Sequence, residues 1–444
     1  MSAAPVREQD RGAGGADSSA PTGSVPTGTV PTGAEPTNLV PALWIVGFAT
    51  AWLGVWMAQL TPIQLLLPTQ VDDILNLGQD DWKASVTGFG TVSAIAGVLA
   101  LVAYPLTGAA SDRTTSRFGR RRPWIALGTV VFAVSLVLLS LQHTMVGVGV
   151  WWSASLVGFC ILTAALTATI SDQVPAHQRG TVSGWMSAPQ ALGILLGVGI
   201  VTALVLGQVA GYVTVAVALV VLVLPFLLTV PDAPLAPEDA PPWSVRTVLL
   251  GLWISPREHP DFAWTLAGRL LVMTGNGFGT ALLLYFLRYG LHDDDADDDL
   301  LTLSLIYMVF VIVAALVLGR LSDRLGRRKV MVFVCAALQG VAALLLAFAP
   351  ALSVAMVGAA FLGLGFGAFL SVDQALATQV LPNAADRGKD LGIMNVAYAV
   401  PQALAPLVGG WLVVQTGSFM ALFLAAGVLA ILGALAVIPV KSVR

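Results

Sequence analysis

Two charged residues lie inside long apolar stretches of this sequence. Arg269 falls about seven residues into an apolar segment near 262–289, and Asp373 about eight residues before the end of another near 351–381. A charge in hydrocarbon is costly and by default marks function or an ion pair. Both residues lie roughly 10 Å deep at about 1.5 Å per residue. We therefore predict an ion pair between Arg269 and Asp373.

Two roles are compatible with this pair. In one, Asp373 binds and releases a proton, and its proton affinity changes as Arg269 moves. In the other, the pair is a static link between two helices. The two residues could also fail to touch. Asp373 is the only carboxylate that the sequence places clearly inside an apolar segment.

Amide, hydroxyl and aromatic side chains also recur within the apolar segments. Asn395, Tyr398 and Gln402, for example, share one helix face at positions i, i+3 and i+7. Such groups suit a neutral polyol such as a sugar, although hydrogen bonds between helices use the same residue types. The candidate substrate-contacting residues are Gln59, Gln64, Asn276, Thr280, Tyr307, Asn395, Tyr398 and Gln402.

Composition indicates which elements position these residues. Of 444 residues, 57% are hydrophobic and 11% are charged, whereas soluble domains carry about 25% charged residues. A membrane-spanning helix needs roughly 20 mostly apolar residues. Twelve such stretches occur, at about 42–67, 84–110, 123–142, 146–171, 181–206, 210–230, 262–289, 300–319, 329–349, 351–381, 391–414 and 418–438. The weakest separations between helices are the short gaps near Gly207 and Gly417.

Loop charges predict the orientation. All of the 22 lysines and arginines except Lys83, Arg269 and Arg288 fall on the side of the N-terminus. Basic loops stay in the cytoplasm, so we expect a multi-pass protein of the cell membrane with both termini cytoplasmic. The expected divisions are a disordered tail (1–38), a six-helix bundle (39–230), a cytoplasmic linker (231–260), a second six-helix bundle (261–440) and a short tail (441–444).

The two halves repeat one another. Gly-Ala-Ala-Ser-Asp-Arg over 108–113 matches Gly-Arg-Leu-Ser-Asp-Arg over 319–324, and Pro-Gln-Ala-Leu recurs at 189–192 and 401–404. Two parallel six-helix repeats are typical of secondary transporters, in which the binding site lies at the interface of the two halves. The sequence therefore predicts an all-α integral membrane protein of twelve transmembrane helices in two pseudo-repeated bundles.

The second loop, with Asp-Arg at 323–324 and Gly-Arg-Arg-Lys at 326–329, resembles the loop signature of the major facilitator superfamily. Residues 111–124, Ser-Asp-Arg-Thr-Thr-Ser-Arg-Phe-Gly-Arg-Arg-Arg-Pro-Trp, are similar to plant sucrose–proton symporters, their animal relatives and bacterial glycoside–cation symporters. Residues 372–392 resemble bacterial members of this branch. The first loop departs from the usual form, since Gly119 follows Asp112 by seven positions rather than three.

The resemblance implies that these loops form a conformational latch. A carboxylate at a helix end can accept hydrogen bonds from the amides of a neighbouring helix N-terminus and can pair with arginine. The alternative is that the loop charges only set the topology. The predicted latch residues are Asp112, Arg113, Gly119, Arg120, Asp323, Arg324, Gly326 and Arg327.

These features favour a secondary active transporter that works by alternating access. We expect cation-coupled symport of a sugar or glycoside by a monomer, with the proton as the coupling cation. The alternatives are proton-coupled efflux of a drug-like or metabolite molecule, and a receptor or scaffold that transports nothing. We expect no enzymatic activity, cofactor, metal site or nucleic-acid partner, because the net charge is −3, the four histidines are scattered and no phosphate-binding loop is present.

Overall fold

The computed structural model describes residues 39–76, 81–175, 178–204, 207–236, 255–325, 328–379 and 387–440. The chain from Glu35 onward forms one compact unit. Within the described ranges the regular structure is helical, with no strand. The expected N-terminal tail (1–38), the C-terminal tail (441–444) and most of the linker, 237–254, lie outside these ranges.

The first half begins with a long helical segment in three parts. These are α1 (Ala42–Thr61), the π-helical turn η1 (Pro62–Leu66) and α2 (Leu67–Leu75). The other helices are α3 (Trp82–Ser111), α4 (Arg122–Ser140), α5 (Met145–Gln173), α6 (Arg179–Ala203) and α7 (Gln208–Thr229).

The second half also begins with a broken helix. Helix α9 (Pro260–Ala281) is followed by α10 (Leu283–Tyr285) and the π-helical turn η4 (Phe286–Gly290), with a 44° bend between α9 and the segment after it. The others are α11 (Ala296–Leu325), α12 (Arg328–Phe348), α13 (Leu352–Gln379), α14 (Arg387–Thr416) and α15 (Phe419–Ala436).

The described residues thus form twelve long helical segments, as predicted. By length and composition eight of them can cross a membrane, or nine with the bent α9–η4 segment, while shorter apolar stretches lie in α6 and α14. The helices are also separated near Gly207 and near Gly417, where the sequence predicted short gaps. Gly207 is the residue before α7, and Gly417 takes the left-handed φ of +69° between α14 and α15.

The first helix is longer than the sequence suggested. Its apolar stretch stops near residue 67, but the helix continues to Leu75 because its polar residues find partners inside the protein. Gln70 is fully buried and donates through Nε2 to the Leu139 carbonyl at 2.9 Å. The π-helical turn that starts at Pro62 occupies the position of the predicted proline kink, since proline cannot donate the helical hydrogen bond.

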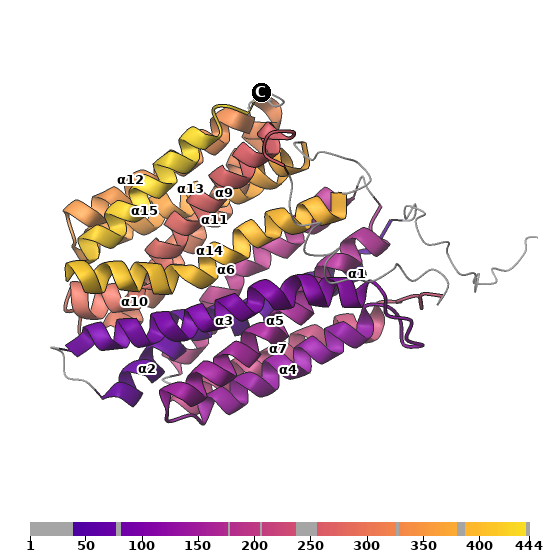
Figure 1. Cartoon of the computed structure of the whole chain (residues 1–444), viewed down its shortest axis with the longest axis horizontal. Helices are drawn as coiled ribbons and strands as arrows, with labels where there is room; N and C mark the ends of the chain where they lie inside the picture. The colour runs from indigo at the N-terminus through magenta and orange to yellow at the C-terminus, as the bar shows by residue number, and fades with distance from the viewer. Residues whose placement is uncertain are drawn as a thin grey trace, which may run out of the picture. The chain divides into compact units, whose positions relative to one another are not determined.

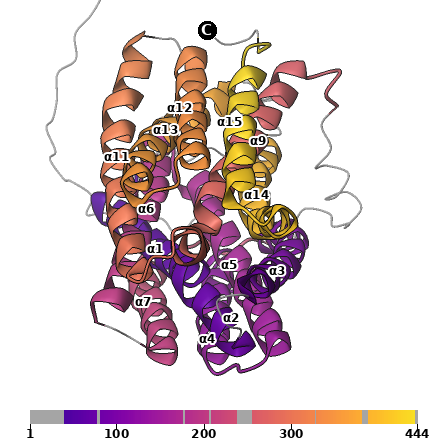
Figure 2. The same ribbon diagram turned by 90° about the vertical axis from the view of Figure 1, so that its left-hand side faces the viewer.

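The helices of the two halves pack in the same order. In the first half the segment containing α1 contacts α6 and α7, α5 contacts α3 and α4, and α4 contacts α7. In the second half α9 contacts α14 and α15, α13 contacts α11 and α12, and α12 contacts α15. Each pair corresponds position by position to its counterpart, so the sequence repeat is a repeat of packing (Figures 1 and 2).

Two helix pairs form the most extensive contacts between the halves, and they too are related by the repeat. Helix α3 packs along α14, and α6 packs against α11 (Figure 1). A Cβ atom on Gly90 of α3 would lie 2.8 Å from the Pro406 carbonyl oxygen of α14, so this glycine permits the close approach. We call the end that holds the loop 112–121 the basic end and the end that holds the loop 291–295 the acidic end.

Candidate functional site

The structure brings Arg269 and Asp373 together. Arg269 projects from α9 and Asp373 from α13, and Arg269 Nε lies 3.3 Å from Asp373 Oδ2. The two residues are 2% and 3% exposed. Neither Nε nor Nη1 of Arg269 meets hydrogen-bond geometry with any described group. The pair is therefore a close, buried ion pair, and two nitrogen atoms of its guanidinium have no hydrogen-bond partner among the described groups.

Hydrogen bonds of amide side chains cross the middle of the molecule near the repeated Pro-Gln dipeptides. Gln190 of α6 donates through Nε2 to the Tyr398 hydroxyl of α14 at 2.6 Å, which joins the two halves. Gln402 of α14 donates through Nε2 to Asn276 Oδ1 of α9 at 3.3 Å, within the second half. Each glutamine that follows the repeated proline therefore bridges two helices.

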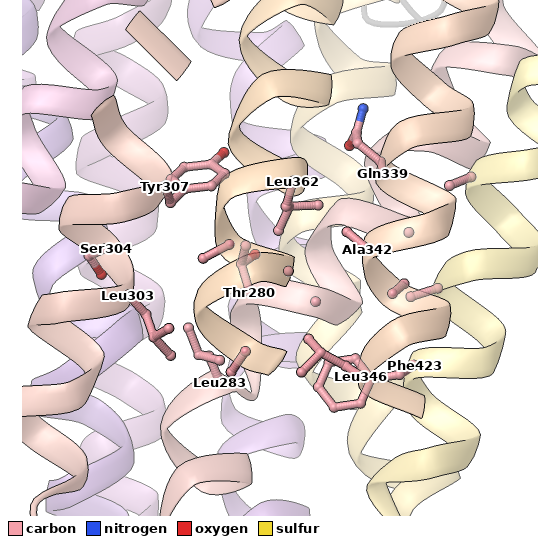
Figure 3. A pocket seen from close by; sticks show the side chains of 18 of the residues that line it. Thr280, Leu283, Leu303, Ser304, Tyr307, Gln339, Ala342, Leu346, Leu362 and Phe423 are labelled. Atoms are coloured by element: carbon pink, nitrogen blue, oxygen red, sulfur yellow. The ribbon is translucent and has the colours of Figure 1, made fainter. Parts of the chain in front are cut away.

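A cavity of about 60 Å³ lies among α9, α11, α12, α13 and α15 of the second half (Figure 3). Three of the predicted substrate-contacting residues, Gln64, Thr280 and Tyr307, line it. Among the described residues, the first half contributes only Gln64 and Ile194 to its lining. This cavity is therefore mainly inside the second bundle, rather than shared equally between the bundles.

The other predicted contact residues lie elsewhere. Gln59, Asn276, Tyr398 and Gln402 do not line the cavity, and the Arg269–Asp373 pair does not reach it either. Gln59 is buried, and its Oε1 has no hydrogen-bond partner among the described groups. Asn395 belongs to α14, but its side chain is outside the described set.

Gln339, which was not among the predicted site residues, also lines the cavity. Gln339 is the only side-chain amide in α12, and it lies between Leu338 and Gly340. A lone amide in an otherwise apolar helix was the available signal. The close-up shows Gln339 at one end of the group of lining side chains and Phe423 at the other (Figure 3).

An ion-pair cluster joins the halves at the acidic end. Arg288 of η4 donates to Asp72 of α2 at 3.0 Å, to Thr69 at 3.1 Å and to Asp297 at 2.9 Å. The Tyr289 hydroxyl donates to the same Asp72 oxygen at 3.2 Å. Asp72 lies near the end of α2, beyond the apolar stretch of the first helix, so the sequence did not mark it as a buried carboxylate.

The loop at the basic end of the first half forms a second network. Asp112 Oδ1 pairs with Arg120 at 3.1 Å and with Arg121 at 2.5 Å, and Arg121 Nε also pairs with Asp172 at 2.7 Å. Arg121 is 2% exposed. Burial tends to lower the pKa of Arg121, but Asp172 and Asp112 outweigh that effect and raise its pKa above the ordinary value.

This network differs in two ways from the predicted latch. The amides at the start of α4 donate to Asp232, which follows α7, instead of to Asp112: the distances are 2.5 Å from Arg121 N and 2.7 Å from Arg122 N. The deeply buried arginine is Arg121, whereas Arg113 Nε has no described partner. A carboxylate distant in sequence occupies the helix end, which spacing within the loop could not reveal.

Gly119 has the role expected of a turn residue. Its φ is +108°, and a Cβ atom there would clash with the Asp232 carboxylate. In the second copy of the motif, Asp323 and Arg324 end α11 with side chains outside the described set, and Gly326 and Arg327 lie between the described ranges.

Comparison with known proteins is decisive for the family. Residues 79–414 match the family model described as "MFS/sugar transport protein". The chain belongs to this family. The family is one of transporters rather than enzymes, and the long apolar helices of this chain are those of a multi-pass membrane protein. The described residues include no group of three or more His, Cys, Asp or Glu side chains that could hold a metal ion.

Related sequences are also MFS-type transporters. One uncharacterised transporter of Mycobacterium tuberculosis is 27% identical over 372 residues, which cover 79% of this chain and 83% of the relative. Another from that species is 32% identical over 111 residues, or 24% of this chain and 15% of the relative. One from Bacillus subtilis is 30% identical over 120 residues, which cover 27% of this chain and 23% of the relative. This chain thus spans less than a quarter of the length of the last two.

Solved MFS structures share the fold. The human organic anion transporter MFSD10 has a TM-score of 0.68 at 17% identity, covering 90% of this chain and 100% of that one. A D-xylose–proton symporter has a TM-score of 0.67 at 18% identity, covering 91% of this chain and 98% of that one. At such low identity these matches establish the fold alone.

Proposed function

We propose that this chain is a proton-coupled symporter of a sugar or glycoside that works by alternating access. The observation that carries the proposal is the buried ion pair of Arg269 and Asp373, which joins α9 to α13. An ion pair this deep in an apolar bundle costs desolvation free energy that only good geometry repays. Two nitrogen atoms of the Arg269 guanidinium have no hydrogen-bond partner among the described groups. This favours a pair that opens during the transport cycle over a static link.

Protonation gives such a pair a means of opening. A neutral Asp373 no longer attracts the guanidinium of Arg269, so α9 and α13 become free to separate. A proton taken up on one side and released on the other then drives a cycle of pairing and separation. We place coupling in the second half for this reason.

Alternating access requires contacts that close one end at a time. The Asp72–Arg288 pair holds the halves together at the acidic end, and Gln190–Tyr398 joins them near the middle. The Asp112 network at the basic end joins α3, α4 and α5 of the first half. We infer that the acidic end is closed in this conformation and that the two bundles rock about the central contacts.

We further propose that the basic end faces the cytoplasm of a cell membrane. Arginine-rich loops are retained on the cytoplasmic side, which places both termini there. Amide, hydroxyl and aromatic groups facing the space between the bundles would bind the sugar. The candidates remain Gln59, Gln64, Asn276, Thr280, Tyr307, Asn395, Tyr398 and Gln402.

Transport by proteoliposomes tests this function. Purified protein would be screened for uptake of radiolabelled sugars and glycosides with and without an inward proton gradient. We expect the gradient to stimulate uptake of at least one sugar, and Asp373→Asn to abolish that stimulation while exchange without a gradient persists. Asp297→Asn is the matched control, because it removes an exposed carboxylate at the acidic end.

Other outcomes would overturn the proposal. Full gradient dependence in Asp373→Asn would exclude coupling through this residue. Gradient-driven extrusion of hydrophobic cations without sugar uptake would instead support efflux. Absence of any flux, despite a folded protein, would favour a receptor or scaffold.

A further inference from the structure

The cavity in the second bundle is mostly apolar, with a few polar groups. Leu303, Leu346 and Phe423 lie in the lower part of the close-up, whereas Tyr307 and Gln339 lie in the upper part with Leu362 between them (Figure 3). The rest of the lining is mostly Ala, Gly, Leu and Ile. An occupant that matches these walls is apolar over most of its surface and polar at one end.

Gln339 supplies the polar end. It is 2% exposed, and neither Nε2 nor Oε1 of its amide has a hydrogen-bond partner among the described groups. A buried amide without partners costs free energy, so glutamine is a poor choice here for packing alone. The amide can both donate and accept, which matches a hydroxyl or an amide on a ligand.

The neighbouring helix makes room for this side chain. A Cβ atom on Gly365 of α13 would lie 2.6 Å from Gln339 Cγ. A larger residue at position 365 would therefore displace Gln339. The position of the amide thus depends on an independent feature of α13.

The size of the cavity limits what it can hold. Its volume of about 60 Å³ compares with roughly 10–15 Å³ for one water by the same kind of measure. A water cluster of that size would need two to four polar partners for each molecule. The Leu, Ala and Phe walls offer few, so a compact apolar group fits better than water.

We propose that this cavity binds a small amphipathic molecule, an alkyl or aryl alcohol or amide, whose polar group hydrogen-bonds to the Gln339 side chain. The apolar part would contain on the order of six non-hydrogen atoms. Three lining residues, Gln64, Thr280 and Tyr307, are also candidate sugar contacts. The cavity does not include the Arg269–Asp373 pair, however, and its occupant is mostly apolar rather than a sugar, so this site goes beyond the proposed transport function.

Photolabelling tests the site directly. The probe is a six-carbon alkyl alcohol that carries a diazirine, applied to the purified full-length chain and mapped by peptide mass spectrometry. We expect saturable labelling of the α12, α13 and α15 residues around Gln339, Leu346 and Phe423, with competition by benzyl alcohol. Labelling that does not saturate and follows exposed α12 residues such as Val341 would overturn the proposal.

Glycine substitutions provide a matched control. Gly279→Ala with Gly358→Ala adds two methyl groups to the cavity wall, and the closest contacts of the new Cβ atoms are 3.8 Å and 3.4 Å, which the packing tolerates. We expect this double variant to reduce saturable labelling about tenfold. Gly149→Ala in α5, whose Cβ atom would lie 3.9 Å from Val92, should leave labelling unchanged. Equal loss in both variants would contradict the assignment.

A third variant tests the hydrogen bond. Gln339→Leu keeps the approximate volume and removes the amide. Affinity for the diazirine alcohol should fall about tenfold, the loss expected for one net hydrogen bond, whereas an alkane diazirine of equal length should label as well as before. Unchanged affinity for the alcohol would exclude Gln339 as the polar partner. None of these readouts involves transport, so the site can fail while the proposed function stands, or the reverse.

Discussion

Arg288 of the second half and Asp72 of the first half form a 3.0 Å ion pair at the acidic end of the molecule. Both residues are mostly buried, with side chains 22% and 15% exposed. Trp82 stacks on Tyr289 at 5.7 Å between ring centroids and on Phe419 at 5.5 Å, which encloses the same region. Any separation of the bundles at this end must therefore break a shielded, charged hydrogen bond.

We predict that Asp72→Asn shifts the protein toward opening at the acidic end. A hydrogen bond to a charged group contributes about 1.5–3 kcal/mol, so alkylation of a cysteine introduced at Gln64 should accelerate by roughly tenfold or more. Background labelling will be low because Cys160 and Cys335 are buried. Asp297→Asn is the control, since it removes a charge from Arg288 without removing the link between the halves. Equal rates in both variants would contradict this role for Asp72.

For the Arg269–Asp373 pair we predict strong non-additivity in stability. Asp373→Leu or Arg269→Met alone should destabilise the protein by about 3–5 kcal/mol, because each leaves an unpaired buried charge. The double variant should recover most of that loss. Unfolding in detergent, followed by intrinsic fluorescence, measures both effects.

The same double variant separates coupling from static linkage. If the pair couples protons to transport, the double variant will be stable but will lack gradient-driven uptake. Recovery of stability together with gradient-driven uptake would show that the pair is structural.

At the basic end, Arg121 should be the critical arginine. Arg121→Ala removes bonds to Ser111, Asp112 and Asp172 from a buried position, so we expect about 3 kcal/mol or more of destabilisation. Nε of Arg113 has no hydrogen-bond partner among the described groups. Arg113→Ala should therefore change the free energy of unfolding by less than about 0.5 kcal/mol. Thermal unfolding of the two variants compares them directly. Similar melting temperatures would contradict the network described above.

Gly119→Ala should destabilise the same loop. The left-handed φ of +108° disfavours any side chain, and a Cβ atom would displace Asp232 from the start of α4, for a combined cost of about 1–3 kcal/mol. Gly108→Ala is the matched control in the same motif, because nothing lies within 4 Å of its Cβ position. It should be neutral or slightly stabilising, since alanine favours helix. A neutral Gly119→Ala would argue against the capping role of Asp232.

The sequence alone determined the helices, the repeat and the two deep charges. The length and periodicity of an apolar stretch are properties of consecutive residues. A membrane-spanning helix requires little more than these. The equal depth of Arg269 and Asp373 was readable because depth along a helix follows from residue count. The resemblance of the loop motifs also sufficed to identify the family.

Only the tertiary structure decided which side chains meet. The fold brings together groups from distant parts of the chain. Asp72 meets Arg288, Asp232 meets the start of α4, and Gln339 meets the other residues that line the second-bundle cavity. Their contacts depend on the rotation of each helix about its axis and on where broken helices bend, as α9 does beside this cavity. Those quantities are set by packing among all the helices at once, so a local pattern in the sequence does not contain them.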